Sequence, residues 1–157
     1  MILTAKVLTV SDGVHHGVRQ DASGAALQEL LVANGWKVAE HRVVADGVES
    51  VAIALEDMCC DFAGLVVTTG GTGFGPRDLT PEGTRSVLER EAPGLAEAMR
   101  LVNPAPGRLS RGVAGTRGTA VVLNTPGSPK GCVECLGAVL DALPHALSLI
   151  TGETTIH

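Results

Sequence analysis

A glycine-rich stretch is the part of the sequence best suited to chemistry. Four glycines lie within the six positions 70–75, and an acidic residue, Asp78, follows shortly after. Glycine has no Cβ, so backbone amides in such a stretch can approach an anion closely. The stretch is neither a P-loop, because no Gly-Lys-Ser/Thr follows, nor a dinucleotide fingerprint, because Pro76 stands where its last glycine would fall. It predicts a phosphate-binding loop; the alternative is a long turn without a ligand.

Two further loops have a similar small, polar character. Residues 9–13 contain Ser11 and Asp12, and residues 124–131 contain the run Thr-Pro-Gly-Ser-Pro that ends at Pro129. The prolines stiffen the second loop, which opens into a helical pattern, so Ser128 and free amides are expected near the positive end of that helix. An ordinary proline-rich turn is the alternative.

Two carboxylates are placed to recruit a cation beside these loops. Asp46 directly follows a predicted strand and Asp78 follows the glycine-rich stretch, so both are expected at one edge of the sheet. Mg²⁺ takes one or two protein carboxylates together with phosphate oxygens, so the pair could hold a metal-bound nucleotide. Alternatively, both aspartates merely cap helices. Asp12 is a weaker candidate of the same kind, and Glu82 is explained by the dipole of its helix.

Composition excludes several classes of function. The 157 residues carry a net charge of -5 and only 2% aromatic residues, whereas proteins that bind nucleic acids usually have a basic face or aromatic stacking platforms. No signal peptide or apolar run long enough to span a bilayer is recognisable, which favours a cytoplasmic protein without a membrane partner. The length and the absence of any composition shift favour a single domain over residues 1–157.

The order of the predicted elements indicates an α/β fold. Apolar, β-branched runs at 7–10, 38–44, 65–68 and 120–123 predict strands, and helical spacing at 25–34 and after Asp46 predicts helices between them. Such alternation implies right-handed crossovers, a mostly parallel sheet and a three-layer α/β/α sandwich. We further expect helices from Thr80 to about Glu91, at 95–102 and from Gly131, broken near Pro144, and a hairpin formed by 111–116 and 119–123.

The cysteines and histidines offer little chemistry of their own. Cys59-Cys60 and the Cys132-x-x-Cys135 pair lie in helical patterns, where small buried cysteines are a simpler interpretation than metal or redox work. The five histidines show no paired spacing, so no zinc site is predicted, and His15-His16 are expected in an exposed loop.

Taken together, the motifs resemble a known family over essentially the whole chain. The motifs are Gly70-Gly71-Thr72-Gly73, Asp78-Leu79-Thr80-Pro81-Glu82, Pro93-Gly94-Leu95, Ser110-Arg111 and Pro126-Gly127-Ser128-Pro129. In this order they resemble the MogA/MoaB family of molybdenum cofactor biosynthesis. The resemblance implies a molybdopterin-binding α/β fold, commonly trimeric, whose active members transfer the adenylyl group of Mg-ATP to molybdopterin.

The resemblance also implies roles for individual residues. Asp46 and Asp78 match the two acidic residues needed for adenylyl transfer and for Mg²⁺. The residues matched to substrate binding are Ser11, Asp12, Gly70, Gly71, Thr72, Gly73, Thr80, Pro126, Gly127 and Ser128. Asn124-Thr125 stands where relatives vary, which we do not take as evidence against activity.

Other functions remain open at the level of sequence. The chief alternative is a MoaB-type protein that binds molybdopterin without transferring adenylyl groups, although retention of both Asp46 and Asp78 favours the enzyme. Related domains occur in the molybdenum insertase and in competence-damage-type amidohydrolases, but the chain is too short for their additional domains. An assembly protein with purely structural glycine loops is the last alternative.

Overall fold

A mostly parallel sheet forms the middle of the molecule. The computed structural model describes residues 1–153, and within them the strands are β1 Thr4–Val10, β2 Lys37–Val44, β3 Gly64–Thr69, β4 Arg90–Glu91, β5 Ala114–Arg117 and β6 Ala120–Thr125. Their order is β2-β1-β3-β6-β5-β4. The first four in this order are parallel, whereas β5 pairs antiparallel with β6 and β4 antiparallel with β5. The predicted sheet with its added hairpin is confirmed.

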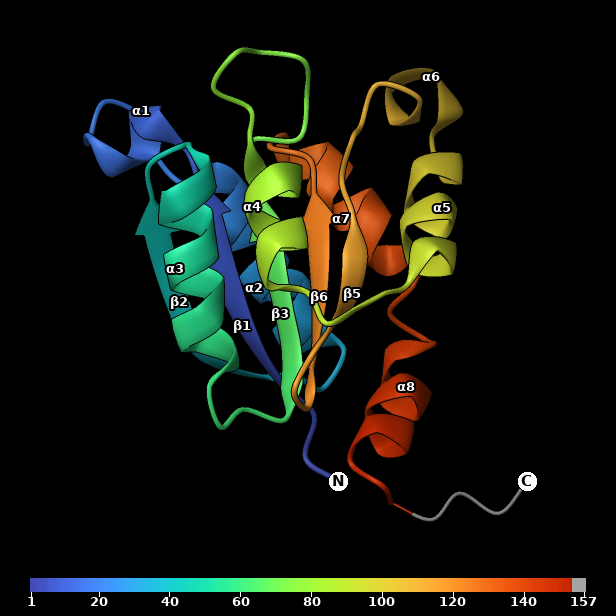
Figure 1. Cartoon of the computed structure of the whole chain (residues 1–157). Helices are drawn as coiled ribbons and strands as arrows, with labels where there is room; N and C mark the ends of the chain where they lie inside the picture. The colour runs from blue at the N-terminus through green and yellow to red at the C-terminus, as the bar shows by residue number, and fades with distance from the viewer. Residues whose placement is uncertain (154–157) are drawn as a thin grey trace.

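Helices cover both faces of this sheet (Figure 1). They are α1 Asp12–His15, α2 Ala22–Ala33, α3 Val48–Cys59, α4 Thr80–Val87, α5 Pro93–Leu101, α6 Pro104–Gly107, α7 Pro129–Gly137 and α8 Leu143–Ile150. One cluster of buried side chains joins α2, α5, α7 and α8 to the sheet, and another joins α3 and α4 to its opposite face. The three-layer α/β/α sandwich is therefore confirmed.

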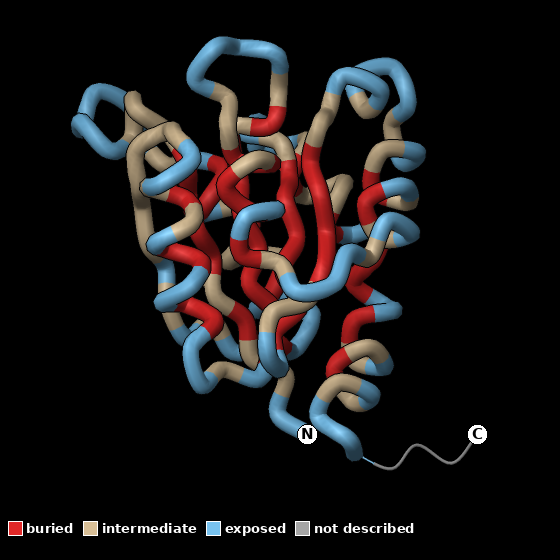
Figure 2. Tube along the Cα trace, viewed as in Figure 1, coloured by how far each residue is buried: buried red, intermediate tan, exposed pale blue. Residues whose placement is uncertain are grey.

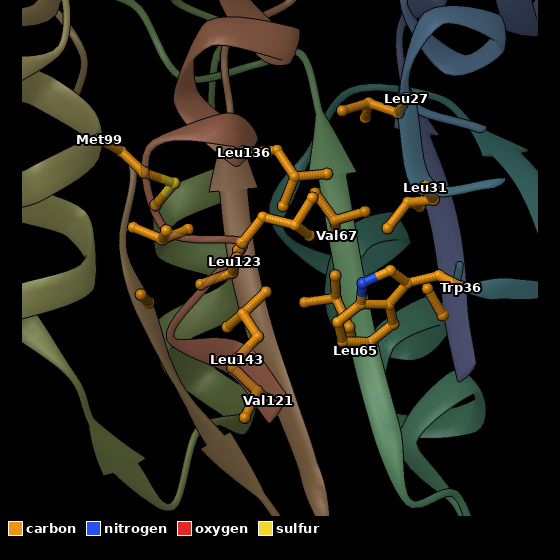
Figure 3. Close-up of a cluster of buried hydrophobic side chains, with 14 of the residues drawn as sticks. Leu27, Leu31, Trp36, Leu65, Val67, Met99, Val121, Leu123, Leu136 and Leu143 are labelled. Carbon is orange, nitrogen blue, oxygen red and sulfur yellow. The ribbon is translucent and has the colours of Figure 1, made fainter. Parts of the chain in front are cut away.

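The strands alternate between the two cores, as the pleat requires. On β3, Leu65 and Val67 pack with the first cluster, while Val66 lies between them in sequence and packs with the second. Every residue of β3 is buried, which explains its continuous apolar and threonine sequence. Figure 3 shows part of the first cluster, with Trp36 beside Leu65, and Figure 2 shows the buried strands inside a shell of exposed helix faces and loops.

The structure corrects two predictions about local elements. The helix expected from Thr80 to about Glu91 ends at Val87, because Leu88 is extended and Arg90–Glu91 pair with β5 as the edge strand β4. The short helices α1 and α6 were not predicted, because single turns lack the periodic apolar pattern that identifies longer helices. His15 thus ends a short helix, although it is exposed as expected.

Parallel register brings the predicted loops to one edge of the sheet. Thr9 of β1 pairs with Thr69 of β3, Thr69 pairs with Thr125 of β6, and Val10 pairs with Val44 of β2. These strands therefore end at the same level, and the segments after them emerge together at the upper edge in Figure 1. None of the helices within residues 1–153 is both long and apolar enough to cross a membrane.

Candidate functional site

A polar cleft of about 510 Å³ lies where these loops meet. Its walls are formed by the end of β1, the segment before α2, the glycine-rich segment after β3 and the segment between β6 and α7. Among the predicted site residues, the cleft is lined by Ser11, Asp46, Gly70, Gly71, Asp78, Gly127 and Ser128. Asp46 and Asp78 thus line the same cleft as residues from all three predicted loops.

The backbone of the glycine-rich segment has a conformation that favours glycine at two positions. Gly70 and Gly71 have φ values of +99° and +69°, in the left-handed region that favours glycine. A Cβ at Gly70 would lie 2.2 Å from the Val10 carbonyl oxygen, and one at Gly71 would lie 2.2 Å from Thr80 Oγ1. Within residues 1–153, the amides of Gly71, Thr72 and Gly73 donate to no protein acceptor. Such unpaired, neighbouring amides are suited to binding an anion.

The segment between β6 and α7 approaches the glycine-rich segment closely. A Cβ at Gly127 would lie 3.3 Å from the Gly70 Cα, and Thr69 Oγ1 donates to the Pro126 carbonyl at 2.8 Å. Ser128 is the N-cap of α7, and its Oγ accepts from the Gly131 amide at 3.0 Å. The predicted start of this helix at Gly131 is thus two residues late, because Pro129 occupies its first turn.

Asp46 belongs to a fixed junction between the ends of β1 and β2. Its Oδ2 accepts from the Asp12 amide at 2.9 Å, and its own amide donates to Asp12 Oδ1 at 3.1 Å. Arg77 donates to both Asp12 carboxylate oxygens, at 2.6 and 3.1 Å, and to the Asp46 carbonyl at 2.9 Å. Asp12 is therefore a link that orients Asp46, and it does not itself line the cleft.

The two carboxylates of this junction differ in their ionisation. Burial is the main factor that raises the pKa of Asp46, and the negative charges of Asp12 and Asp78 raise it further. The Asp12 amide acts in the opposite direction by stabilising the carboxylate. The pKa of Asp12 is lowered, chiefly because Arg77 hydrogen-bonds to it. A carboxylate held in a cleft with a raised pKa gains from a bound cation, which would favour its ionised form.

Asp78 forms hydrogen bonds within the glycine-rich segment and to Arg111. Its Oδ2 accepts from the Gly75 amide at 2.9 Å, and its backbone carbonyl accepts from Arg111 Nη2 at 2.6 Å. Arg111 also donates to the Gly73 carbonyl at 2.8 Å and pairs with Glu82 at 2.8 Å. One guanidinium therefore holds two carbonyls of this segment and the first turn of α4 together.

The interpretation of Asp46 and Asp78 as helix caps is wrong. The N-caps of α3 and α4 are Gly47 and Leu79, and neither helix has a side-chain cap hydrogen bond. Thr80 is the first residue of α4, as expected for the start of this helix. Glu82 lies in the first turn of that helix as expected, but it also forms the ion pair with Arg111.

Five predicted binding residues lie outside the lining of the polar cleft: Asp12, Thr72, Gly73, Thr80 and Pro126. Thr80 is fully buried, and its hydroxyl donates to the Gly70 carbonyl at 2.9 Å, so it supports the glycine-rich segment from beneath. Thr72 is 4% exposed, and its carbonyl accepts from the Arg111 amide. The Thr80 hydroxyl and the Thr72 carbonyl thus help to hold the loop.

A second pocket of about 260 Å³ adjoins the first at Ser128. Its lining includes Ala96, Met99 and Val102 from the region of α5, together with Pro126. Most of its wall is apolar, in contrast to the polar cleft, although Arg100, Asn103, Asn124 and Glu134 also contribute to it. The combined site can therefore receive a molecule that has both a weakly polar part and a charged part.

The donor set fits a cation that arrives with its ligand better than a resident metal. Within residues 1–153, no three His, Cys, Asp or Glu side chains are grouped so as to hold a metal ion. Asp46 and Asp78 supply two carboxylates, and Mg²⁺ commonly completes its shell with phosphate oxygens and water. Burial raises the pKa of Cys59 and of Cys132 to about 11, so both thiols are weak nucleophiles, while Cys60 is exposed, contrary to expectation.

Sequence reasoning assigned no role to the residues that hold the site together. Arg111 is part of the Ser110-Arg111 motif, Arg77 is part of no motif quoted above, and no sequence pattern indicates the link between Thr9, Asp21 and His41. In that link, Asp21 Oδ2 accepts from Thr9 Oγ1 at 2.7 Å and lies 2.8 Å from His41 Nε2, while its Oδ1 caps α2. Arginines beside a glycine-rich stretch were the available signal, because carbonyls left exposed by a loop need donors.

The sequence is similar to known proteins over most of its length. Residues 6–145 match the family model described as "Probable molybdopterin binding domain". The chain is similar to the molybdopterin adenylyltransferase of Helicobacter pylori strain J99, with 41% identity over 94% of this chain and 87% of that protein. It is 36% identical to the molybdopterin adenylyltransferase of Escherichia coli K12, over 93% of this chain and 84% of that protein.

Solved structures give the same result for the fold. The crystal structure of the molybdopterin biosynthesis enzyme MoaB from Thermus thermophilus superposes with a TM-score of 0.88. It is 48% identical to this chain, and the match covers 97% of this chain and 98% of that one. The Mog protein of Mycobacterium ulcerans also superposes with a TM-score of 0.88, at 36% identity and with 98% of this chain covered.

Proposed function

Because this chain belongs to the family of probable molybdopterin-binding domains, we propose that it is a molybdopterin adenylyltransferase of molybdenum cofactor biosynthesis. It binds molybdopterin and transfers the adenylyl group of Mg-ATP to the terminal phosphate, releasing pyrophosphate. The observation that carries this proposal is that Asp46 and Asp78 line the same cleft as Gly70, Gly71 and Ser128. Anion-binding backbone and cation-binding carboxylates are thereby within reach of one bound phosphate chain.

Positioning is the main task of such a site. The terminal phosphate of molybdopterin is already anionic, so it needs no general base before it attacks the α-phosphorus of ATP. The obstacle is the repulsion between two anions, which a protein overcomes by holding them in line and stabilising the charge that develops. We assign the pterin phosphate to the free amides of the glycine-rich segment and of the segment that carries Ser128.

The carboxylates and the second pocket complete this assignment. Asp46 and Asp78 would hold Mg²⁺ on ATP, and the ion would neutralise charge on the departing pyrophosphate. Asp12 and Arg77 keep Asp46 in place through the hydrogen bonds described above. The mostly apolar pocket beside Ser128 is assigned to the planar ring system of the pterin, whose edges could meet Asn103 or Asn124.

The proposal is tested most directly by Asp78→Asn. We expect pyrophosphate release from molybdopterin and Mg-ATP to fall by about 10²-fold or more, because a charge that stabilises the transition state is lost. Molybdopterin binding should remain essentially unchanged, because the asparagine oxygen can still accept from the Gly75 amide. Asp141→Asn, an exposed aspartate between α7 and α8, is the matched control.

The results separate the enzyme from its alternatives. Unchanged turnover in Asp78→Asn would remove this residue from the catalytic role. A native chain that binds molybdopterin but releases no pyrophosphate would be a MoaB-type binding protein instead. A chain that gives no heat on titration with molybdopterin would have glycine loops of purely structural purpose.

A further inference from the structure

Of the arginines near the cleft, Arg19 is not used by the scaffold. Arg77 is bonded to Asp12 and to the Asp46 carbonyl, and Arg111 is bonded to Glu82 and to two loop carbonyls. Arg19 follows α1, is exposed and lines the cleft. Within residues 1–153 its guanidinium has no hydrogen-bond or ion-pair partner. All of its side-chain donors are therefore available to a ligand.

The base of Arg19 is nevertheless well held. The amides of Val18 and Arg19 donate to the Gly13 carbonyl at 3.0 and 3.2 Å. The side chain then passes over Gly13, where an added Cβ would lie 3.5 Å from Arg19 Nε. A side chain packed along its stem loses less freedom when its head group binds a ligand, so the guanidinium is partly preorganised.

The charges of the cleft explain why such a cation is needed. Its ionisable lining consists of Arg19 and three carboxylates, those of Asp21, Asp46 and Asp78, in a chain of net charge -5. A phosphate that enters this cleft meets negatively charged side chains. A cation that arrives with the ligand offsets this charge only near Asp46 and Asp78. Within the described residues, the Arg19 guanidinium is the only cationic group of the cleft lining. It can offset the remaining negative charge by bidentate contact with a phosphate.

We propose that Arg19 is a phosphate-binding residue of this cleft, which contacts an oxygen of a bound phosphate group through its guanidinium. The inference rests on the proposed function only for the identity of the phosphate, which belongs either to the pterin or to ATP. Arg19 forms no hydrogen bond or ion pair with Asp46 or Asp78, so it affects phosphate binding rather than the recruitment of magnesium.

The test compares Arg19→Gln and Arg19→Lys with the native chain. Direct binding is measured by calorimetry with inorganic pyrophosphate and with Mg-ATP, and the KM for each substrate is measured separately. Loss of a charge-assisted contact should weaken binding of a phosphate ligand by about tenfold or more. Arg19→Lys should recover part of this loss, because it keeps the charge but not the planar fork. Arg90→Gln, on the far edge strand β4, removes the same charge away from the cleft.

The two substrates distinguish the source of the phosphate. A raised KM for ATP with an unchanged KM for molybdopterin assigns Arg19 to the nucleotide, and the reverse pattern assigns it to the pterin phosphate. Affinities and KM values that match those of Arg90→Gln would overturn the inference, and so would a lowered Tm with unchanged binding, which would mark a structural residue.

The inference and the proposed function can fail separately. If the native chain releases no pyrophosphate but binds phosphate ligands more tightly than Arg19→Gln does, the phosphate site stands and the transferase activity does not. If turnover is normal in Arg19→Gln while Asp78→Asn is inactive, the transferase stands and the Arg19 site does not.

Discussion

At the scale of single residues, two neighbouring aspartates of the site lie in opposite electrostatic environments. Asp46 is held in the cleft by the Asp12 amide, yet burial and two neighbouring carboxylates raise its pKa. Asp12, which lies beside it, has a lowered pKa because Arg77 bonds to it. One aspartate thus serves as a stable link, while the other carries a penalty that a cation would remove.

This contrast gives a prediction for Asp46→Asn. The pKa of Asp46 is raised in the folded state, so its carboxylate is less favourable there than in the unfolded chain. The free energy of unfolding is therefore lower at a pH where Asp46 is ionised in both states than at a pH where it is protonated in both. The variant removes this charge while its amide oxygen can still accept from Asp12, so its Tm at pH 7 should equal or exceed that of the native chain. The gain should disappear as the pH falls through the folded-state pKa of Asp46. Calorimetric melts from pH 3 to pH 8 measure this, over a range set by the ordinary aspartate pKa of about 3.9.

The activity of the same variant should change in the opposite direction. Adenylyl transfer is expected to fall by about 10²-fold or more, because one of two carboxylates assigned to magnesium is neutral. A stable but inactive protein would show that the charge is kept for function at the expense of stability. A clear loss of Tm at pH 7 would instead show that the carboxylate contributes more through its hydrogen bonds than burial removes.

At the scale of elements, loops are fixed by a few polar contacts rather than by apolar packing. The glycine-rich segment is held by Thr80 beneath it, by Asp78 within it and by Arg111 from the segment before β5. Backbone carbonyls that leave regular structure need donors, and a guanidinium can supply several at fixed angles. The conformation of the glycine-rich segment therefore depends on Thr80 and Arg111, which do not line the cleft, as well as on Asp78, which does.

Arg111→Ala tests this dependence. The variant leaves Glu82 and the carbonyls of Gly73 and Asp78 without their donor, which should lower stability by about 1–2 kcal/mol. For a chain of this size, each kcal/mol lowers the Tm by about 2–4 °C. We also expect a higher KM for molybdopterin, because the loop amides lose their fixed positions, and Arg111→Lys should restore little of it.

Arg85→Ala is the matched control for that experiment. Arg85 pairs with Glu91 at 3.3 Å, but both side chains are about 60% exposed, at 59% and 61%. Exposed pairs of this kind contribute about 0–1 kcal/mol, so Tm and KM should hardly change. Equal effects of the two variants would mean that Arg111 has no special part in holding the loop.

At the scale of the whole molecule, the proposed function requires a negatively charged chain to bind anionic partners through dipoles and a few charges at one edge of the sheet. The net charge of -5 gives no general attraction for phosphate, so under this proposal binding depends on the three loops that parallel register brings together. The resemblance to the MogA/MoaB family adds the expectation of a trimer. Light scattering should then give a mass of three times the 16.0 kDa of one chain, and a mass of 16.0 kDa would contradict the expectation.

The sequence by itself determined the layers of the fold and the edge of the sheet at which the polar cleft lies. Periodic apolar runs separate strands from helices, and parallel strands that alternate with helices place successive loops on one side of the sheet. Asp46, Asp78 and Ser128 could be located by this logic alone, because each follows the end of a strand. The same logic misplaced the end of α4, since the pairing of Arg90–Glu91 with β5 is a long-range contact without a local pattern.

Only the tertiary structure decided which residues face the cleft and which hold it in place. Thr80 and Asp12 belong to the same motifs as the cleft residues, yet one is buried under Gly70 and the other is tied to Arg77. Arg19, which belongs to no motif, lines the cleft with a guanidinium that has no hydrogen-bond or ion-pair partner within residues 1–153. Spacing along the chain fixes the level at which a side chain leaves the sheet, whereas its direction and partners depend on contacts between segments that are distant in sequence.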